Sequence, residues 1–499
     1  MKLAADGSNH QLLIEQNKSN HLNGILLSVG GNLVGLIASL GTIMVAARVL
    51  SKDDLGAFFL VMVVVQFVAL FSDLGLKNTA IKTLSSLPVG SLQFIETTRY
   101  LLTITTSASI VGCIVLWSAM PVIKSIWPYE VFHNQLIYVG PISIVTAMFQ
   151  IITSILVGGK QFKKLSVVAA TMEILRAMIS AAGLIAGLGV SSLFWGMIIS
   201  RLVGIGAVWV AMPSWFALSF WYGRSADLFK FGGWLYGGSL ISASMVRCSD
   251  AILTSYLGPA ALAVYSAAMQ IPAVMQRVFE TTRPALLGYV AAYHGTYEKQ
   301  QVEAVRILTA VLAVAATMLI PLASPLMTLL YSDQYVSGIM IMQALTLWAV
   351  FAIVNYFYSV ILIGKGQPRR AFFLTVPQLF IMLLSAPWLV PQYGGFGGAI
   401  ALIITAFLGN IIGAKIIAGN DNEMWLALVS NMIRAGGPLL LVLVTVTHVT
   451  LSIFPSVCLT GLTLAALILL RVITAADVNA LWVVLSRIIG RMSIRPTAV

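Results

Sequence analysis

Charged side chains interrupt several of the longest apolar runs of this sequence. They are Glu173 and Arg176 in TMEILRAM, Arg201 in IISRLVG, Arg247 and Asp250 in VRCSD, and Arg277 and Glu280 in QRVFETTRP. A charge at the centre of a bilayer costs about 2.5–3.5 kcal/mol on insertion scales, so each group needs a polar environment or a partner. Guanidinium binds phosphate oxygens through two parallel hydrogen bonds and stays charged in a dehydrated site. The arginines are therefore candidates for binding an anionic headgroup.

The same residues could instead form local ion pairs that hold helices together. Each of the three acids stands three residues from an arginine, a spacing that places both on one helix face. Arg201 has no acid within a helical turn, which favours a water-filled cavity with an anionic ligand. For the other groups both interpretations stay open. Substrate binding is predicted for Arg176, Arg201, Arg247 and Arg277, with Glu173, Asp250 and Glu280 as charge partners or coupling groups.

Composition places these groups in a membrane protein. Charged residues make up 9% of the 499 residues and hydrophobic ones 59%, with a mean hydropathy of +0.95. Soluble domains carry about 25% charged residues, so a water-soluble fold is excluded. Cys113, Cys248 and Cys458 stand singly in apolar runs, which predicts neither a disulfide framework nor a metal site.

Apolar runs long enough to span a bilayer recur along the chain. We predict about 14 spans, at 22–47, 55–75, 100–120, 135–158, 165–188, 193–212, 232–256, 261–283, 304–323, 337–363, 371–390, 396–417, 433–454 and 456–475. The predicted fold class is an all-α polytopic membrane protein.

The distribution of Lys and Arg predicts the orientation of these spans. If the N-terminus lies inside, most of the 29 Lys and Arg fall in inside loops, whereas the outside loops hold only Arg48, Lys52 and Lys124. The positive-inside rule then predicts that both termini are cytoplasmic. The net charge of +12 is explained mainly by this pattern, so no nucleic-acid partner is expected.

Two short basic loops reveal an internal repeat. One constant shift aligns GGKQFKK at Gly158–Lys164 with GKGQPRR at Gly364–Arg370. The shift matches glycine to glycine, glutamine to glutamine and basic pair to basic pair: Gly158 with Gly364, Gln161 with Gln367, and Lys163 and Lys164 with Arg369 and Arg370. Nearly the same shift aligns LSKDDLGAFF with LGPAALAVYS. We therefore predict two parallel lobes of six spans, related by an axis along the membrane normal, with a C-terminal helix pair.

The repeat also indicates which charges the scaffold itself does not need. The positions of the second repeat that correspond to Glu173, Arg176 and Arg201 are apolar or aromatic. They are Leu379, Met382 and Phe407.

These observations divide the chain into six parts. They are a cytoplasmic N-terminal segment (1–21), an N-lobe (22–212), an inter-lobe linker (213–231), a C-lobe (232–417), a further helix pair (433–475) and a basic tail (477–499). In the tail, Arg487, Arg491 and Arg495 recur every four residues beside an apolar face. This pattern predicts an amphipathic helix on an anionic membrane surface.

Several motifs, in their order along the chain, resemble those of the Wzx-type polysaccharide (O-antigen) flippases of the multidrug/oligosaccharidyl-lipid/polysaccharide (MOP) exporter superfamily. They are ARVLSKDDLGAFFLV, SDLGLKNTAIK, GKQFKK, YLGPAALAVYSAA after Asp250, LLYSDQY and GKGQPRR. The resemblance covers about residues 20–475 and implies two six-span lobes around a cationic cavity. It also implies a substrate, an undecaprenyl-pyrophosphate-linked oligosaccharide unit passed from the cytoplasmic to the periplasmic leaflet of the bacterial inner membrane.

The same resemblance implies the partners of the chain. They are the lipid bilayer, the lipid-linked substrate, and a polysaccharide polymerase with its chain-length machinery; a monomer is expected. No cofactor motif is present, and without an ATP-binding GxxxxGK[ST] or a large external loop neither an ATPase nor a polymerase is expected. The alternative function is a multidrug or cation antiporter of the same superfamily, which would need unpaired acids in its cavity.

Overall fold

The structure is a computed structural model that describes residues 35–217, 219, 225–292, 297–448 and 453–469. Every element in these ranges is an α-helix or a short 3-10 helix. Nine of the described helical stretches are long and apolar enough to cross a membrane. The all-α polytopic fold class is therefore confirmed. The predicted N-terminal segment and the basic tail lie outside the described residues.

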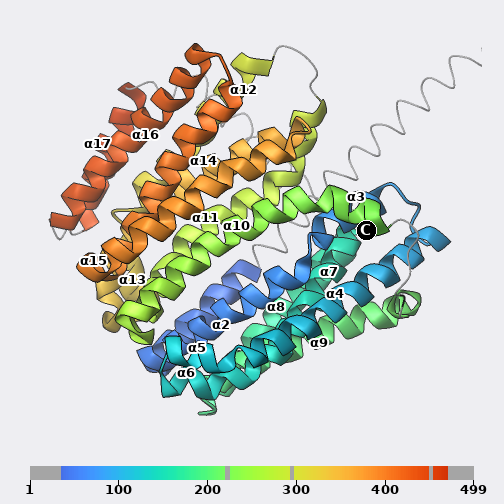
Figure 1. Ribbon diagram of the computed structural model, residues 1–499. Coiled ribbons are helices and arrows are strands. Elements are labelled where there is room, and N and C mark those ends of the chain that lie inside the picture. Colours follow the sequence, from blue (N-terminus) through green and yellow to red (C-terminus); the bar gives the residue numbers. More distant parts are fainter. Residues whose placement is uncertain (1–34, 218, 220–224, 293–296, 449–452, 470–499) are drawn as a thin grey trace, which may run out of the picture.

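The first half of the chain forms one group of helices (Figure 1). Its helices are Gly35–Val49, α2 (Lys52–Asp73), α3 (Leu76–Ser85), α4 (Leu92–Ser118), α5 (Met120–Ile126), α6 (Glu130–Gln135), α7 (Val139–Gly158), α8 (Phe162–Ile185) and α9 (Ser191–Ala211). A 3-10 helix at Leu136–Tyr138 precedes α7, and another at Pro213–Phe216 follows α9. This group is called the N-lobe below.

The second half forms another group beside it (Figure 1). Its helices are α10 (Ser225–Leu257), α11 (Pro259–Ala292), α12 (Tyr297–Leu319), α13 (Ala323–Tyr331), the 3-10 helix Asp333–Gly338, α14 (Ile339–Gly364), α15 (Pro368–Ala418), α16 (Asn422–His448) and α17 (Ile453–Leu469). Helices α10 to α15 are called the C-lobe; α16 packs against α12, α14 and α15, and α17 packs against α12 and α16.

Within the described residues, each predicted span lies mostly on helix, and the differences have local causes. Helix α15 contains two of the predicted spans, joined at Gly394, whose φ of 61° lies in the left-handed region that glycine adopts without strain. Helix α10 begins earlier than predicted, inside the expected linker. Helix α3 was missed because it is too short to span; it buries Leu76, Ala80 and Leu84, which recur every four residues on one face.

The two repeats use the same backbone hydrogen bonds. Gln161 N donates to the Leu156 carbonyl at 2.9 Å, and Lys160 N to that of Val157 at 2.9 Å; the corresponding bonds of Gln367 and Gly366 also measure 2.9 Å each. This pattern is a Schellman motif, which ends a helix with one residue in the left-handed conformation. Lys160 and Gly366 take that conformation, with φ of 55° and 74°.

The two lobes meet along equivalent helices. Helices α2 and α11 occupy matching places in the repeats and pack against each other. Helix α10 also packs against α2 and α3, and Tyr236 of α10 donates a hydrogen bond to the Leu70 carbonyl at 3.1 Å. The end of the molecule that bears Gly158–Lys164 and Gly364–Arg370 is called the loop end below, and the other end the opposite end.

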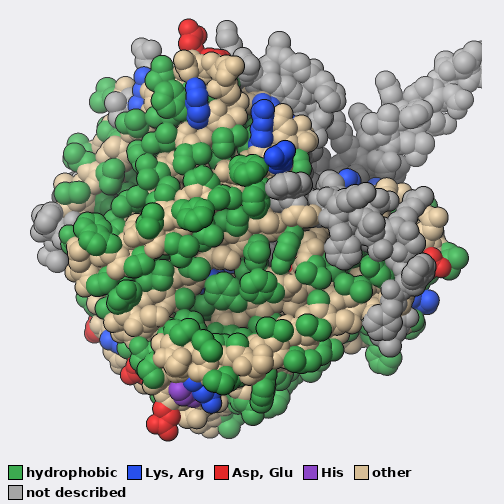
Figure 2. Space-filling view, in the orientation of Figure 1, with side chains coloured by type: hydrophobic (Ala, Val, Ile, Leu, Met, Phe, Trp, Pro, Cys, Tyr) green, Lys and Arg blue, Asp and Glu red, His purple; other side chains and the backbone are tan. Residues whose placement is uncertain are grey.

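Side-chain chemistry on the surface fits a membrane setting. Figure 2 shows apolar side chains over the broad middle of one face, with charged side chains gathered toward its upper and lower edges. Exposed large apolar residues include Ile114 at 63%, Trp209 at 56% and Leu384 at 77%. Such exposure is expected where lipid rather than water surrounds the helices.

Candidate functional site

A cavity of about 760 Å³ lies between the two lobes. Its lining comes from Gly35–Val49, α2, α7, α8 and α9 of the N-lobe and from α10 and α11 of the C-lobe. All seven charged residues singled out from the sequence line it: Glu173, Arg176, Arg201, Arg247, Asp250, Arg277 and Glu280. Groups that are distant in the sequence thus share one space.

An ion pair from α8 faces this space on the N-lobe side. Arg176 Nη2 lies 2.6 Å from Glu173 Oε2, so the spacing of three residues does form a local pair. The Glu173 side chain remains 41% exposed, and that of Arg176 18%. The helix Gly35–Val49 approaches the pair so closely that a β-carbon at Gly35 would lie 3.1 Å from Glu173 Cγ. Glycine at this position leaves room for the acid.

Arg201 on α9 has a different environment. Its Nη1 donates to Thr146 Oγ1 of α7 at 2.5 Å, and it forms no ion pair with any described residue. One hydroxyl uses a single N–H of a group that carries five. Most of the guanidinium donors are therefore available to a ligand.

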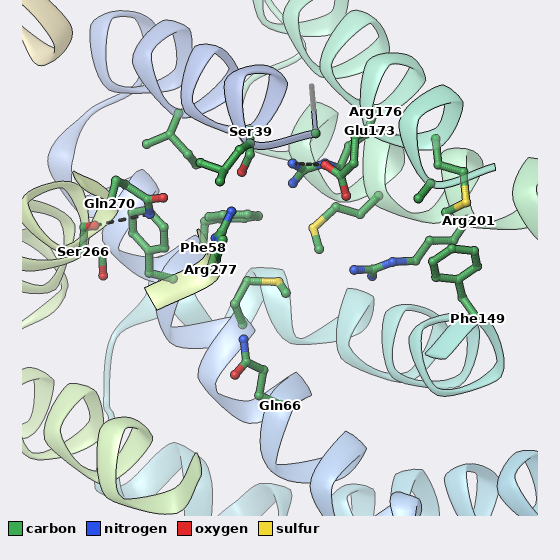
Figure 3. Close-up of a pocket in the computed structure, with 18 of the residues that line it drawn as sticks. Ser39, Phe58, Gln66, Phe149, Glu173, Arg176, Arg201, Ser266, Gln270 and Arg277 are labelled. Carbon is green, nitrogen blue, oxygen red and sulfur yellow. Dashed lines mark hydrogen bonds and ion pairs between the residues drawn. The ribbon is translucent and has the colours of Figure 1, made fainter. Parts of the chain in front are cut away.

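Arg277 brings a positive charge to the cavity from the C-lobe. The residue is exposed, and within the described part of the chain no ion pair includes it. In Figure 3 the side chains of Arg176, Arg201 and Arg277 extend toward the same open space from three different helices. Such an arrangement can surround an anion with converging N–H donors.

A second ion pair lies on α10. Arg247 Nη1 is 2.8 Å from Asp250 Oδ2, and the side chain of Asp250 is only 7% exposed. Burial of a carboxylate requires such a partner. This pair therefore has a clear structural role, whatever it contributes to binding.

Uncharged polar and aromatic residues complete the lining. Sequence reasoning missed them because an uncharged side chain in an apolar run gives no signal comparable to that of a charge. Those labelled in Figure 3 are Ser39, Phe58, Gln66, Phe149, Ser266 and Gln270. They add hydroxyl, amide and ring surfaces to the ionic groups.

The residues of the two repeat loops lie elsewhere. None of Gly158, Gln161, Lys163, Lys164, Gly364, Gln367, Arg369 and Arg370 lines this cavity. Gly158 allows the end of α7 to approach α3, since a β-carbon there would lie 2.9 Å from Leu84 Cβ. Gln367 Oε1 accepts a hydrogen bond from Arg370 at 3.2 Å. The first contact packs α7 against α3 and the second lies within the loop, and neither involves a residue that lines the cavity.

At the opposite end, hydrogen bonds cross between the two lobes. Trp127 Nε1 donates to Ser255 Oγ at 2.9 Å, and Tyr129 Oη donates to the Thr254 carbonyl at 3.1 Å. The Arg48 guanidinium also crosses between the lobes, donating to the Leu329 carbonyl at 2.5 Å. These bonds join the N-lobe to the C-terminal end of α10 and to α13.

Comparisons with known proteins agree with this architecture. The family model described as "Polysaccharide biosynthesis protein" matches residues 45–340. The chain is similar to the probable flippase AglR of Haloferax volcanii, with 24% identity over 320 residues that cover 61% of this chain and 65% of that protein. The matched part thus spans slightly less than two thirds of the relative.

Solved structures with the same fold include two kinds of transporter. The lipid II flippase MurJ in an inward closed conformation has a TM-score of 0.69 and 14% identity, with 90% of this chain and 98% of that chain covered. A multidrug resistance MATE family transporter of the MOP superfamily, in an inward-facing conformation, has a TM-score of 0.57 and 15% identity, covering 83% and 98%. With this fold and a family match over more than half of its length, the chain belongs to the polysaccharide biosynthesis protein family.

Proposed function

We propose that this protein is a flippase, a transporter rather than an enzyme, that moves an undecaprenyl-pyrophosphate-linked oligosaccharide unit from the cytoplasmic to the periplasmic leaflet of the bacterial inner membrane. The observation that carries the proposal is the convergence of Arg176, Arg201 and Arg277 on one cavity between the lobes. The family match and the similarity to a probable flippase support it.

The chemistry of the cavity suits a pyrophosphate. Arg201 and Arg277 have no ion-pair partner among the described residues, so their charge remains for a ligand. Because they come from different lobes, a bound anion would bridge the lobes at the place where they must move relative to each other. Binding energy could then be coupled to rocking of one lobe against the other, as in transporters built from parallel repeats.

The antiporter alternative is less well supported. A cation carrier would need acids in its cavity that are free of local partners. Glu173 and Asp250 are each held by an arginine, at 2.6 Å and 2.8 Å. Their negative charge is therefore neutralised within the protein.

Transport into sealed proteoliposomes tests the proposal directly. The full chain is reconstituted with a fluorescent undecaprenyl-pyrophosphate disaccharide, and movement between leaflets is followed by protection from an impermeant quencher. We expect Arg201→Ala and Arg277→Ala each to slow movement by more than tenfold. Lysine at either position should restore part of the rate, because it keeps the charge but loses the bidentate geometry.

Arg99→Ala is the matched control. Arg99 is an arginine on α4 whose Nε donates to the Ser214 carbonyl at 2.7 Å, outside the cavity. It should transport at the wild-type rate. Wild-type rates in both cavity variants, or faster movement of an organic cation than of the anionic lipid, would contradict the proposed function.

A further inference from the structure

A second, smaller cavity lies within the C-lobe. It measures about 320 Å³ and is lined by residues of α10, α11, α14 and α15. Glu280 of α11 lines both this cavity and the one between the lobes, so the two adjoin at that residue. A ligand in the larger cavity could extend past Glu280 into the C-lobe.

The lining of the C-lobe cavity differs in chemistry from that of the arginine cavity. No arginine or lysine is among the described residues that line it, and Glu280 is the one charged group there. Hydroxyls and carboxamides supply the other polar groups, and aromatic rings supply flat apolar surfaces. The polar groups include Ser239, Ser242, Gln276, Asn355, Thr375 and Gln378. Apolar and aromatic walls with a few placed polar groups are typical of pockets for small uncharged molecules.

Two lining side chains carry N–H groups that form no hydrogen bond with any described residue. They are Trp348 Nε1 and Asn355 Nδ2, on residues that are 2% and 5% exposed. Buried donors are nearly always paired, because an unpaired one forfeits its hydrogen bond to water. Both lie on α14, two turns apart. N–H groups repel cations, so they favour a ligand that presents acceptor oxygens.

The Asn355 carboxamide is held in place by its neighbours. Its Oδ1 accepts from Gln378 Nε2 at 3.1 Å, and the same nitrogen donates to the Leu374 carbonyl at 2.9 Å. Gly409 makes room for the pair, since a β-carbon there would lie 2.5 Å from Asn355 Nδ2. A preorganised amide of this kind can recognise a ligand without the entropic cost of being ordered on binding.

We propose that the C-lobe cavity binds one uncharged sugar of the lipid-linked oligosaccharide whose anionic headgroup occupies the arginine cavity, an assignment that rests on the proposed function. A sugar offers ring and hydroxyl oxygens, or an acetamido carbonyl, to Trp348 and Asn355, and its hydroxyls can donate to Glu280. Its C–H faces can lie against the aromatic side chains. A volume of about 320 Å³ is near the lower end of the range for small-molecule pockets, which suits a sugar ring rather than a whole oligosaccharide.

The absence of arginine and lysine from the described lining also predicts which sugars are disfavoured. A uronic acid would bring a carboxylate into a cavity that offers it no basic partner there, and burying an unpaired carboxylate is costly. The cavity should therefore select neutral or N-acetylated sugars over acidic ones.

Binding of three synthetic lipids to the purified full-length protein in detergent tests this assignment. The lipids are undecaprenyl pyrophosphate alone, the same lipid carrying one N-acetylglucosamine, and the same lipid carrying one glucuronic acid. We expect the N-acetylglucosamine lipid to bind at least tenfold more tightly than the sugar-free lipid, and the glucuronic acid lipid to gain little. Trp348→Phe, which keeps a ring but removes the N–H, should reduce the gain from N-acetylglucosamine about three- to tenfold, as expected for one hydrogen bond.

Trp425→Phe is the matched control. Trp425 of α16 also has an indole N–H without an acceptor among the described residues, and it lines neither cavity. This variant should keep the wild-type ratio of affinity for the N-acetylglucosamine lipid to affinity for the sugar-free lipid, and thermal unfolding should show that both variants are folded.

Equal affinity of the wild type for the first two lipids, or equal ratios for the two tryptophan variants, would overturn the sugar site while leaving the proposed function intact. No binding of any of the three lipids would instead overturn the proposed function.

Discussion

Gly56 of α2 and Pro259 of α11 touch backbone to backbone at the opposite end of the molecule. A β-carbon at Gly56 would overlap the carbonyl oxygen of Pro259. The contact joins the two lobes, and it lies within a pair of helices that are equivalent in the repeat. Because backbone atoms on Pro259 leave nothing that can rotate away, only glycine permits this approach.

Gly56→Ala should therefore separate the lobes at the opposite end. The added methyl group must displace the start of α11, which would also weaken the nearby bond between Trp127 and Ser255. We expect a cysteine at Ser266, which lines the cavity, to react with an aqueous thiol reagent several-fold faster from that side. Transport should slow because the protein spends less time with this end closed.

Gly41→Ala is a suitable control for the Gly56→Ala substitution. Gly41 lies in the helix Gly35–Val49, and a β-carbon there would meet no atom within 4 Å. This variant should transport and label like the wild type. Unchanged labelling of Ser266→Cys in the Gly56→Ala background would show that the close contact does not control access.

Two of the described ion pairs outside α8 include an arginine: Arg247 with Asp250, and Arg306 with Glu303. Removing the arginine should lower the free energy of unfolding much more in the first pair than in the second. Arg247→Ala leaves the carboxylate of Asp250, only 7% exposed, without its partner. Breaking a buried pair in this way costs about 3–5 kcal/mol. The partner acid of Arg306 is Glu303, whose side chain is 53% exposed, so Arg306→Ala should cost no more than about 1 kcal/mol.

Reversible unfolding in detergent checks this comparison. The double variant Arg247→Ala with Asp250→Asn should recover much of the lost stability, because the uncompensated charge is gone. Equal losses for Arg247→Ala and Arg306→Ala would mean that Asp250 is solvated in the protein, contrary to its burial.

The two repeat loops allow a reciprocal test of backbone strain. Lys160 and Gly366 occupy equivalent left-handed positions, with φ of 55° and 74°. A side chain in this region costs about 1–2 kcal/mol, part of which is offset because glycine loses more entropy on folding. Lys160→Gly should therefore stabilise the protein by about 0.5–1 kcal/mol, and Gly366→Lys should destabilise it by a similar amount. Midpoints of thermal unfolding that shift in the same direction for both variants would contradict this assignment.

The sequence predicts the helices and the charged part of the cavity for related physical reasons. A span must be apolar over its length, and a charge within it is costly, so both leave strong signals in one sequence. Arg201 and Arg277 could be selected in this way, although their convergence from two lobes depends on tertiary packing.

Other features leave no such signal. Asn355 and Trp348 are ordinary residues of an apolar helix, and only their unpaired donors in the folded protein mark them. The glycines near 394 predict a junction between two spans. They do not predict that helix continues from both spans right up to Gly394. The close contact at Gly56 depends on how α2 meets α11, which no local pattern encodes.

Orientation in the membrane is a prediction that labelling can decide. The concentration of Lys and Arg at the loop end predicts that this end is cytoplasmic. Lys163, Arg369 and Asp333 are exposed, the first two in the repeat loops and the third near the opposite end. After Cys113, Cys248 and Cys458 are replaced by serine, single cysteines at Lys163 and Arg369 should react in intact cells only with membrane-permeant maleimides. A cysteine at Asp333 should react with impermeant ones as well.

Permeabilised cells, in which all three positions should react, provide the control for access. Reaction of position 369 with the impermeant reagent in sealed cells would reverse the predicted topology, and with it the direction of transport proposed above.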